Sequence, residues 1–449
     1  MKDTTVSHRF VWRHALLLPL ILVPTLPWAM AATSAPSRTA KRSGARAAPV
    51  SLVWHVETLD GGEVSSIQGD QPINPASVVK VATTLWALEK LGPLHRFDTV
   101  FAAAGAVDAE KKTLAGDLVV LGAGDPDFHV ENAFLVALRL NQLGIRQVRG
   151  ALRVSETFWI GWEGGSARTI KDPQVRAQQM AQRLRAALDP KRWTAATRRA
   201  WRDFAARHDV PAASLPAVAV MGGIGTASRR ADEHRVLVTH RSKSVADALR
   251  RFDCFSNNDI ERLEASLGSA SDLARRISEV IEAPPEAVFL ETTSGLGTNR
   301  MTPRSVVRLL RALRATCDRL GLSVESLLPV AGCDPGTLNH SFARLGTGPN
   351  AMSVSAKTGT LTSTDGGTAV LAGFVSTGRG DLAFCVATPR AGGRLHQARS
   401  AQARWLEQLI VAADGPRPRR CAGPLVSPEE GAQILSAEPS WIQGRTAGR

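Results

Sequence analysis

Ser77 and Lys80 stand three positions apart in the segment Asn74-Pro75-Ala76-Ser77-Val78-Val79-Lys80. Residues three apart on a helix lie on the same face, so these two side chains can contact each other. Asn74 can cap such a helix and Pro75 can occupy its first position, which places Ser77 near the positive end of the helix dipole. The residues after Lys80 are almost all apolar, and desolvation lowers the pKa of a buried lysine. The pair therefore predicts a serine nucleophile with a lysine as its proton acceptor.

A serine and a lysine at this spacing also occur by chance, and a buried helix with one capped polar turn is the alternative interpretation. Two further patterns favour chemistry. Ser256-Asn257-Asn258 follows an amphipathic helical run; Ser256 offers a hydroxyl for proton relay and Asn258 an amide for substrate recognition. Lys357-Thr358-Gly359 lies in a predicted strand, along whose edge an extended peptide can align.

The residues of the predicted strand have separate roles in this interpretation. Lys357 and Thr358 can hold a substrate carboxylate. Gly359 leaves room for the substrate to approach the strand closely. The backbone N–H groups of Ser77 and Thr360 can form an oxyanion hole. Together the three patterns predict an acyl-transfer site.

These three patterns resemble the motifs of the low-molecular-mass class C penicillin-binding proteins, the D-Ala-D-Ala carboxypeptidase and endopeptidase family. The resemblance covers roughly residues 50–412 and extends to further segments, namely Gly124-Asp125-Pro126, Ser294-Gly295-Leu296 and Pro329-Val330-Ala331-Gly332. Thr292 and Thr293 stand where the family has Asp and Gly. We expect this departure to alter loop packing more than chemistry.

The resemblance implies a serine-type D-Ala-D-Ala carboxypeptidase, a DD-endopeptidase, or both, acting through a Ser77 acyl-enzyme. Its partners would be peptidoglycan stem peptides and cross-links, with β-lactams as covalent inhibitors. Two alternatives remain: a non-catalytic peptidoglycan-binding scaffold with the same fold, and a β-lactamase. Lys80 and Ser256 lie much farther apart in the sequence than the corresponding motifs of a class A β-lactamase, which implies a large inserted region.

The predicted fold class is mixed α/β: a penicillin-binding/transpeptidase-like antiparallel sheet flanked by helices, an all-helical region and an inserted accessory domain. Alternating apolar residues predict a three-stranded meander over 354–362, 368–376 and 382–387, followed by a helix over 397–412. Thr302-Pro303 predicts a helix start. The expected organisation is a signal peptide at 1–31, a flexible linker at 32–49, a peptidase domain at 50–94 and 241–413, an accessory domain at 95–240 and a disordered tail at 414–449.

The beginning of the chain has the pattern of a secretory signal. A basic start precedes an apolar run from Ala15 to Trp28, and Ala29-Met30-Ala31 is typical of a cleavage site. The alternative is an uncleaved N-terminal anchor. No later stretch is long and apolar enough to be expected to cross a bilayer. We therefore expect an exported, periplasmic protein.

The chain is strongly basic, with a formal net charge of +14. No nucleic-acid-binding motif accompanies this charge, so the expected partners are the anionic cell wall and, peripherally, the membrane surface rather than nucleic acid. Residues 168–208 are rich in Lys and Arg with helical apolar spacing around Met180, Leu184 and Leu188. This pattern favours a solvated basic helical face over a polyanion site. Nothing in the sequence indicates a particular oligomeric state.

Other candidate residues favour structural roles. The five cysteines are odd in number and widely spaced, which favours buried free thiols, although export would permit one or two bridges. Trp159 and Trp162 are expected to pack in a core rather than line a pocket, and Asp125 is expected to stabilise a turn rather than bind a cation. The histidines form no metal-binding pattern and no nucleotide-binding loop is present, so we expect no metal and no cofactor.

Overall fold

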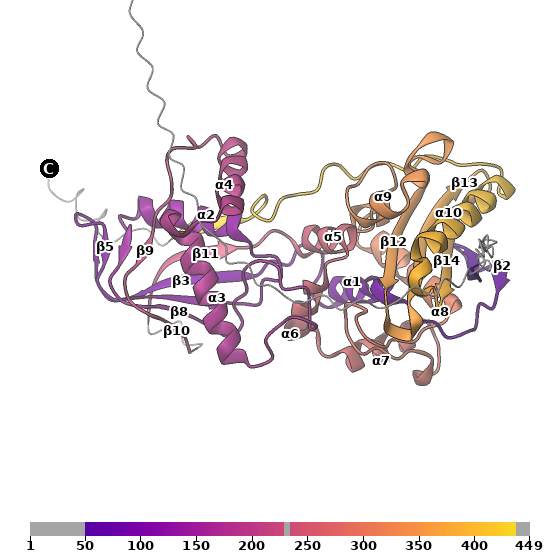
Figure 1. The fold of residues 1–449 in the computed structure, drawn as a ribbon, viewed down its shortest axis with the longest axis horizontal. Coiled ribbons are helices and arrows are strands. Elements are labelled where there is room, and N and C mark those ends of the chain that lie inside the picture. Colours follow the sequence, from indigo (N-terminus) through magenta and orange to yellow (C-terminus); the bar gives the residue numbers. More distant parts are fainter. Residues whose placement is uncertain (1–49, 229–233, 437–449) are drawn as a thin grey trace, which may run out of the picture. The chain divides into compact units, whose positions relative to one another are not determined.

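The computed structural model describes residues 50–228 and 234–436 (Figure 1). The described residues belong to one compact unit. A five-stranded antiparallel sheet in the order β12-β13-β14-β1-β2 carries the predicted meander. Its strands are β1 (Val53–Thr58), β2 (Glu63–Ile67), β12 (Val354–Leu361), β13 (Thr368–Thr377) and β14 (Gly380–Pro389). The meander is thus confirmed, with β12 at one edge of the sheet.

Helices cover both faces of this sheet because its apolar side chains alternate between the faces. Val370 and Phe374 of β13 pack into a core that contains the helices α1 and α8, whereas Leu371 and Val375 pack into a core that contains α10. The helices are α1 (Val79–Lys90), α5 (Val245–Phe255), α6 (Glu264–Leu267), α7 (Ala270–Val280), α8 (Pro303–Arg319), α9 (Thr337–Ser341) and α10 (Leu395–Ala412). Thr302 accepts a hydrogen bond from the backbone N–H of Ser305 at the start of α8, as the sequence predicts.

Most of the region between α1 and α5 builds two further sheets around a separate hydrophobic core. The larger has the order β10-β8-β6-β3-β11-β15, with β3 (Asp98–Ala104), β6 (Asp117–Gly122), β8 (Leu152–Val154), β10 (Ile224–Thr226), β11 (Arg235–Arg241) and β15 (Gln433–Ser436). The smaller has the order β4-β5-β7-β9, with β4 (Val107–Asp108), β5 (Thr113–Leu114), β7 (Gln147–Val148) and β9 (Ala219–Val220). The helices of this region are α2 (Val130–Gln142), α3 (Pro173–Leu188) and α4 (Ala195–Arg207).

The basic segment 168–208 contains α3 and α4. Met180 and Leu184 of α3 are fully buried, in agreement with the predicted spacing. Trp201 of α4 is 2% exposed and packs on Phe134 of α2, whereas Arg199 and Arg202 on the other side of α4 are exposed. Each helix therefore buries an apolar stripe. Only α4 presents exposed basic side chains to solvent, because the arginines of α3 (Arg176, Arg183 and Arg185) are partly buried.

Residues 414–436 form an ordered segment, so the prediction of a disordered tail is wrong for this part of 414–449. β15 pairs with β11 in the larger sheet. Arg419 bonds to Glu325 and Asp381, and Glu429 is 2% exposed. The low apolar content that suggested disorder is offset by ion pairs and by backbone pairing. Residues 437–449 lie outside the described residues.

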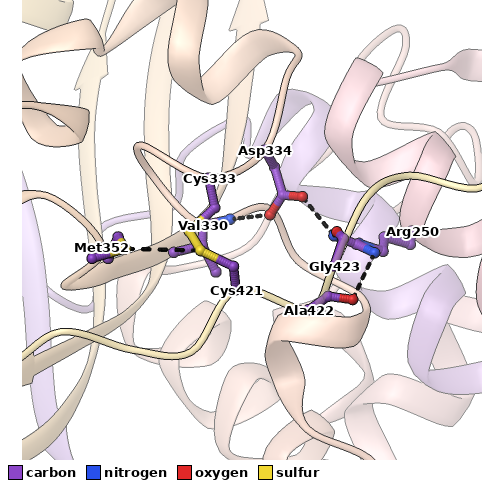
Figure 2. The surroundings of a disulfide bond; sticks show 8 residues. All are labelled: Arg250, Val330, Cys333, Asp334, Met352, Cys421, Ala422 and Gly423. Atoms are coloured by element: carbon purple, nitrogen blue, oxygen red, sulfur yellow. Dashed lines mark hydrogen bonds and ion pairs between the residues drawn. A yellow bond between two sulfur atoms is a disulfide. The ribbon is translucent and has the colours of Figure 1, made fainter.

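A disulfide joins Cys333 to Cys421 (Figure 2). It ties the segment 414–436 to the loop that follows Val330, a residue that pairs with Ser355 of β12. Beside it, Nη2 of Arg250 on α5 donates to Asp334 (2.6 Å) and to the backbone oxygen of Gly423 (2.7 Å). The remaining cysteines are free and buried; they are Cys254, Cys317 and Cys385. The favoured interpretation of unpaired thiols therefore holds for three of the five.

No helix in the ranges 50–228 and 234–436 is long and apolar enough to span a membrane. The predicted signal peptide at 1–31 and the linker at 32–49 lie outside the described residues.

Candidate active site

Ser77 lies in a short 3-10 turn, η1 (Ala76–Val78), that leads directly into α1. The side chain of Asn74 accepts a hydrogen bond of 3.0 Å from the backbone N–H of Ala76. Ala76 itself has a left-handed backbone, with φ of 49°. Pro75 precedes this turn rather than starting α1. The sequence predicted that Asn74, Pro75 and Ser77 belong to the start of the helix, whereas they lie in, or just before, the 3-10 turn that precedes it. The result is a sharp turn that presents Ser77.

Lys80 is fully buried, and its Nζ has three hydrogen-bond partners. These are Ser77 Oγ at 3.1 Å, Asn258 Oδ1 at 2.8 Å and the backbone oxygen of Ser294 at 2.7 Å. Burial, and next the charge of Lys357, hold the pKa of Lys80 well below its ordinary value. A neutral amine can donate to Asn258 and Ser294 and still direct its lone pair at the hydroxyl of Ser77. Lys80 is thus arranged to accept that proton.

Ser256 ends α5 in a left-handed conformation, with φ of 54°. Its Oγ accepts a hydrogen bond of 2.9 Å from Nζ of Lys357. Asn258 follows in a second 3-10 turn, η3 (Asn258–Leu263). The left-handed conformation of Ser256 reverses the chain direction. As a result Ser256 contacts Lys357 of β12, while Asn258 contacts Lys80.

The edge strand β12 carries Lys357, Thr358, Gly359 and Thr360 beside Ser77. The backbone N–H of Ala356 donates to Pro329, on the side of β12 away from β13. Because strand residues alternate, the N–H groups of Thr358 and Thr360 point to that same side. Burial lowers the pKa of Lys357 to about 8, although Asp253 opposes this effect.

Two glycines allow other segments to reach the Ser77 turn. A Cβ atom on Gly359 would lie 2.6 Å from the backbone oxygen of Pro75. A Cβ atom on Gly295, whose φ is +86°, would lie 2.0 Å from the backbone oxygen of Ala76. Both contacts are too close for any side chain, so glycine is required for the observed packing.

Asp253 is a buried charged residue that the sequence analysis did not select. Its carboxylate lies on α5 and accepts a hydrogen bond of 2.8 Å from Thr84 of α1. Burial raises the pKa of Asp253 to about 6, against the opposing effects of Lys357, Thr84 and Lys80. An acidic residue on the apolar side of a helix, three positions before Ser256, was the only sequence signal for it.

The structure brings all eight predicted site residues together from four segments: the Ser77 turn with α1, the end of α5, η3 and the edge strand β12. They are Ser77, Lys80, Ser256, Asn258, Lys357, Thr358, Gly359 and Thr360. Residues 49–184 and 212–409 match the model of the D-Ala-D-Ala carboxypeptidase 3 (S13) family. The chain belongs to this family. The predicted resemblance to D-Ala-D-Ala carboxypeptidases is thereby confirmed.

Comparisons with individual proteins agree with this membership of the S13 family. The chain is 36% identical over 110 residues to the D-alanyl-D-alanine carboxypeptidase of Actinomadura sp. (strain R39), a match that spans 24% of this chain but only 20% of that relative. Bd3459, a predatory peptidoglycan endopeptidase from Bdellovibrio bacteriovorus, matches with a TM-score of 0.70 at 22% identity, over 86% of this chain and 100% of Bd3459. Penicillin-binding protein 4 from Haemophilus influenzae matches with a TM-score of 0.55 at 17% identity, over 80% and 97% of the two chains.

These structural matches support the mixed α/β class predicted for this S13 family member, with its sheets and flanking helices.

In this S13 family member, a loop of the region between α1 and α5 packs directly on η3. The carboxylate of Asp259 accepts hydrogen bonds of 2.8–3.0 Å from three consecutive backbone N–H groups, those of Glu163, Gly164 and Gly165. The amide of Asn258 contacts the backbone oxygen of Gly164 at 3.4 Å. The loop therefore fixes the segment that carries Asn258.

Two tryptophans beside that loop differ in burial. Trp159 is half-buried and lies against the guanidinium groups of Arg176 and Arg262, each 4.7 Å from its ring. Trp162 is 49% exposed, so the prediction that it packs in a core is wrong. Gly161 and Gly164 near it both have positive φ, and the Trp162 ring lies beside His129 and the guanidinium of Arg251.

The Gly124-Asp125-Pro126 loop is a turn, as expected for Asp125. Its carboxylate accepts a hydrogen bond of 3.0 Å from the backbone N–H of Asp127. Burial raises the pKa of Asp125 to about 7. Burial alone would also raise the pKa of Asp127, but Lys243, together with His129 and Arg251, holds it far below the ordinary value.

Proposed function

We propose that this chain is a serine-type D-Ala-D-Ala peptidase that acts on peptidoglycan stem peptides through a Ser77 acyl-enzyme. The observation that carries the proposal is the hydrogen-bonding distance of 3.1 Å between Nζ of the buried, pKa-lowered Lys80 and Oγ of Ser77. This pair has the geometry of an activated nucleophile and its base. Ser256 and Lys357 form a second hydroxyl–lysine pair on the opposite side of the site.

In the proposed acylation step, Ser77 Oγ attacks the carbonyl carbon of the penultimate D-Ala. The hydroxyl proton moves to Nζ of Lys80, and the carbonyl π electrons move to its oxygen. The backbone N–H groups of Ser77 and Thr360 stabilise this oxyanion, which is where negative charge develops. Asn258 and the edge of β12 hold the extended peptide.

Collapse of this intermediate breaks the peptide C–N bond, and the leaving amine needs a proton. Ser256 Oγ supplies it and takes up the proton that Lys80 received from Ser77, so that Lys80 is neutral again. Water then attacks the acyl carbonyl and gives a proton to Lys80, the ester C–O bond breaks, and Lys80 returns that proton to Ser77 Oγ. If the leaving amine is free D-Ala the reaction is that of a carboxypeptidase, and if it belongs to a cross-link the reaction is that of an endopeptidase.

Mass spectrometry of purified peptidoglycan fragments tests the proposal. We expect wild-type protein to release D-Ala from pentapeptide fragments, to open cross-linked dimers, or both, and Ser77→Ala to do neither. Binding without any product would support the scaffold alternative. Rapid release of hydrolysed penicillin, with no action on peptidoglycan fragments, would support the β-lactamase alternative.

We also propose that the protein acts outside the cytoplasm, in the periplasm. Its family acts on D-Ala-D-Ala bonds, and the disulfide between Cys333 and Cys421 suits an oxidising compartment. Residues 50–94 and 241–413 would form the peptidase domain and 95–240 an accessory domain, to which β15 adds a strand. The exposed basic face of α4 suits peripheral association with the anionic cell wall or membrane.

A further inference from the structure

Asp365 lies in η8 (Thr364–Gly366), the short turn that joins β12 to β13. Its backbone is left-handed, with φ of 55°. One oxygen of its carboxylate, Oδ2, accepts a hydrogen bond of 2.7 Å from Nδ2 of Asn74. Asn74 stands just before the turn that presents Ser77. Asp365 therefore connects the far end of the edge strand with the turn that carries the nucleophile.

Arg300 fixes the carboxylate of Asp365 through two parallel hydrogen bonds. Its Nη1 donates to Oδ2 at 2.8 Å, and its Nη2 donates to Oδ1 at 2.9 Å. A bidentate pair of this kind sets the direction of a carboxylate as well as its distance. Nη1 also donates to the backbone oxygen of Asn299 at 2.8 Å, so the guanidinium itself is anchored. The hydrogen bonds from Arg300 and Asn74 hold the pKa of Asp365 below its ordinary value, so the carboxylate is charged at neutral pH.

The side-chain amide of Asn74 is buried, and both of its ends form hydrogen bonds. Oδ1 accepts from the backbone N–H of Ala76, whereas Nδ2 donates to Asp365 and to the backbone oxygen of Gly297, the latter at 3.0 Å. If the amide turned over, its NH₂ group would face the N–H of Ala76, and two donors cannot bond to each other. A carboxylate only accepts, so Asp365 favours the orientation in which Oδ1 faces Ala76.

The hydrogen bond to Ala76 is important because the backbone of Ala76 is unfavourable. Its φ of 49° lies in the left-handed region, which residues other than glycine rarely adopt. Such a conformation persists only where the surrounding structure holds it. Ser77 is the next residue, so the direction of its side chain depends on this turn. Release of the turn would displace Oγ of Ser77 from Nζ of Lys80, which lies 3.1 Å away.

We propose that Asp365 is a positioning residue for Ser77: it fixes the amide of Asn74, and this amide fixes the left-handed turn. The inference rests on the proposed acyl transfer by Ser77. In the described part of the chain, the side chain of Asp365 bonds to Asn74 and Arg300, so it acts on the nucleophile through Asn74. Loss of its charge should slow acylation without weakening the first binding of a β-lactam.

Penicillin separates these two effects, because saturation kinetics give the Kd of the first non-covalent complex and the rate constant of acylation. For Asp365→Asn we expect the rate constant to fall about 10-fold and Kd to change less than about 2-fold. Asp414→Asn is the matched control. Asp414 also has a left-handed backbone, with φ of 65°, and accepts two hydrogen bonds from one arginine, Arg379. This control should be acylated at the wild-type rate.

An exchange of donor and acceptor tests the route through Asn74. Asn74→Asp places a second carboxylate against Asp365, and we expect acylation to be slower than in Asp365→Asn. In the double variant Asn74→Asp/Asp365→Asn, the new amide can donate to the new carboxylate, which still accepts from Ala76. We therefore expect acylation at least about 3-fold faster than in Asn74→Asp alone.

A wild-type rate constant in Asp365→Asn would overturn the inference, as would a loss that Kd shares equally. A double variant no faster than Asn74→Asp would show that Asp365 does not act through Asn74. If Asp365→Asn does not fold, Arg300→Gln decides: it keeps the carboxylate but removes its bidentate anchor, and an unchanged rate constant would overturn the inference. A folded wild-type protein that penicillin does not acylate would instead contradict the proposed function.

Discussion

Thr84 of α1 donates a hydrogen bond of 2.8 Å to the buried carboxylate of Asp253 on α5. This bond joins the helix that carries Lys80 to the helix that ends at Ser256. The carboxylate also acts on both lysines of the site, because its charge opposes the effect of burial on the pKa of Lys80 and of Lys357. Asp253 therefore connects the packing of two helices with the protonation of the site.

Asp253→Asn is expected to shift the pH profile of acylation by penicillin toward lower pH. The amide keeps an oxygen for Thr84 but removes a negative charge, so the pKa values of Lys80 and Lys357 both fall. Acylation requires neutral Lys80 and, in our account, charged Lys357, whose pKa is about 8. Both the acid limb, set by Lys80, and the alkaline limb, set by Lys357, should therefore shift to lower pH.

The pKa of Asp253 is about 6, so the carboxylate is already protonated at lower pH. We expect the variant and the wild type to converge below that pH. Asp318→Asn, which removes an exposed carboxylate on α8, is the control and should leave the profile unchanged. An alkaline limb that stays in place in Asp253→Asn would show that Asp253 does not influence Lys357.

Gly295→Ala is expected to displace the nucleophile turn. The added methyl group would lie 2.0 Å from the backbone oxygen of Ala76, and φ of +86° strains any other residue. We expect the acylation rate to fall by about 100-fold, since a shift of about 1 Å in a reacting group has that effect. Gly223→Ala, where the methyl group meets nothing within 4 Å, should acylate at the wild-type rate. Equal rates in the two variants would contradict the packing described.

Loss of the disulfide is expected to destabilise the protein. Cys333 and Cys421 are 88 positions apart, and bridges that close long loops typically contribute about 2–4 kcal/mol. The double variant Cys333→Ser/Cys421→Ser should therefore unfold at lower temperature by circular dichroism. A reductant should lower the melting temperature of the wild type to the same value and leave that of the variant unchanged. A wild-type melting temperature that ignores the reductant would contradict a stabilising bridge.

Asp259→Asn is expected to loosen the loop that packs on η3. Three backbone N–H groups share the wild-type carboxylate, which also lies 3.3 Å from the buried guanidinium of Arg262. A neutral amide has one acceptor oxygen and leaves Arg262 without that counter-charge. Hydrogen exchange at Glu163–Gly165 should become faster, whereas Asp203→Asn on the exposed side of α4 should leave it unchanged. Unaltered protection of these amides would rule out Asp259 as their anchor.

The sequence selected residues that the structure brings together, because their patterns follow local rules. A serine and a lysine three apart on a helix share one face, and alternating apolar residues predict the strand that carries Lys357 and Gly359. Gly359 was expected to leave room for the substrate, which stays a prediction; in the structure the neighbour that it accommodates is Pro75 of the Ser77 turn. The contact from Lys80 to Asn258 depends on the whole fold, and the sequence analysis did not predict it.

The predictions that were missing or wrong concern interactions between segments far apart in the chain. Asp253 looks like an ordinary helix residue until Thr84 and the two lysines are placed around it. The segment 414–436 has few apolar residues, and its order comes from Cys333, from Glu325 and from pairing with β11. Its composition carries no sign of these distant partners. The exposure of Trp162 likewise could not be read from its residue type.

Peptide mapping by mass spectrometry after reaction with penicillin tests the central claim most directly. The account predicts one penicilloyl group per chain, attached to Ser77, in the wild type. It predicts no adduct in Ser77→Ala and a slowing of about 100-fold or more in Lys80→Met, because general base catalysis contributes about 10²–10⁴-fold. An adduct on any other residue, or a folded wild-type protein that forms none, would contradict the account.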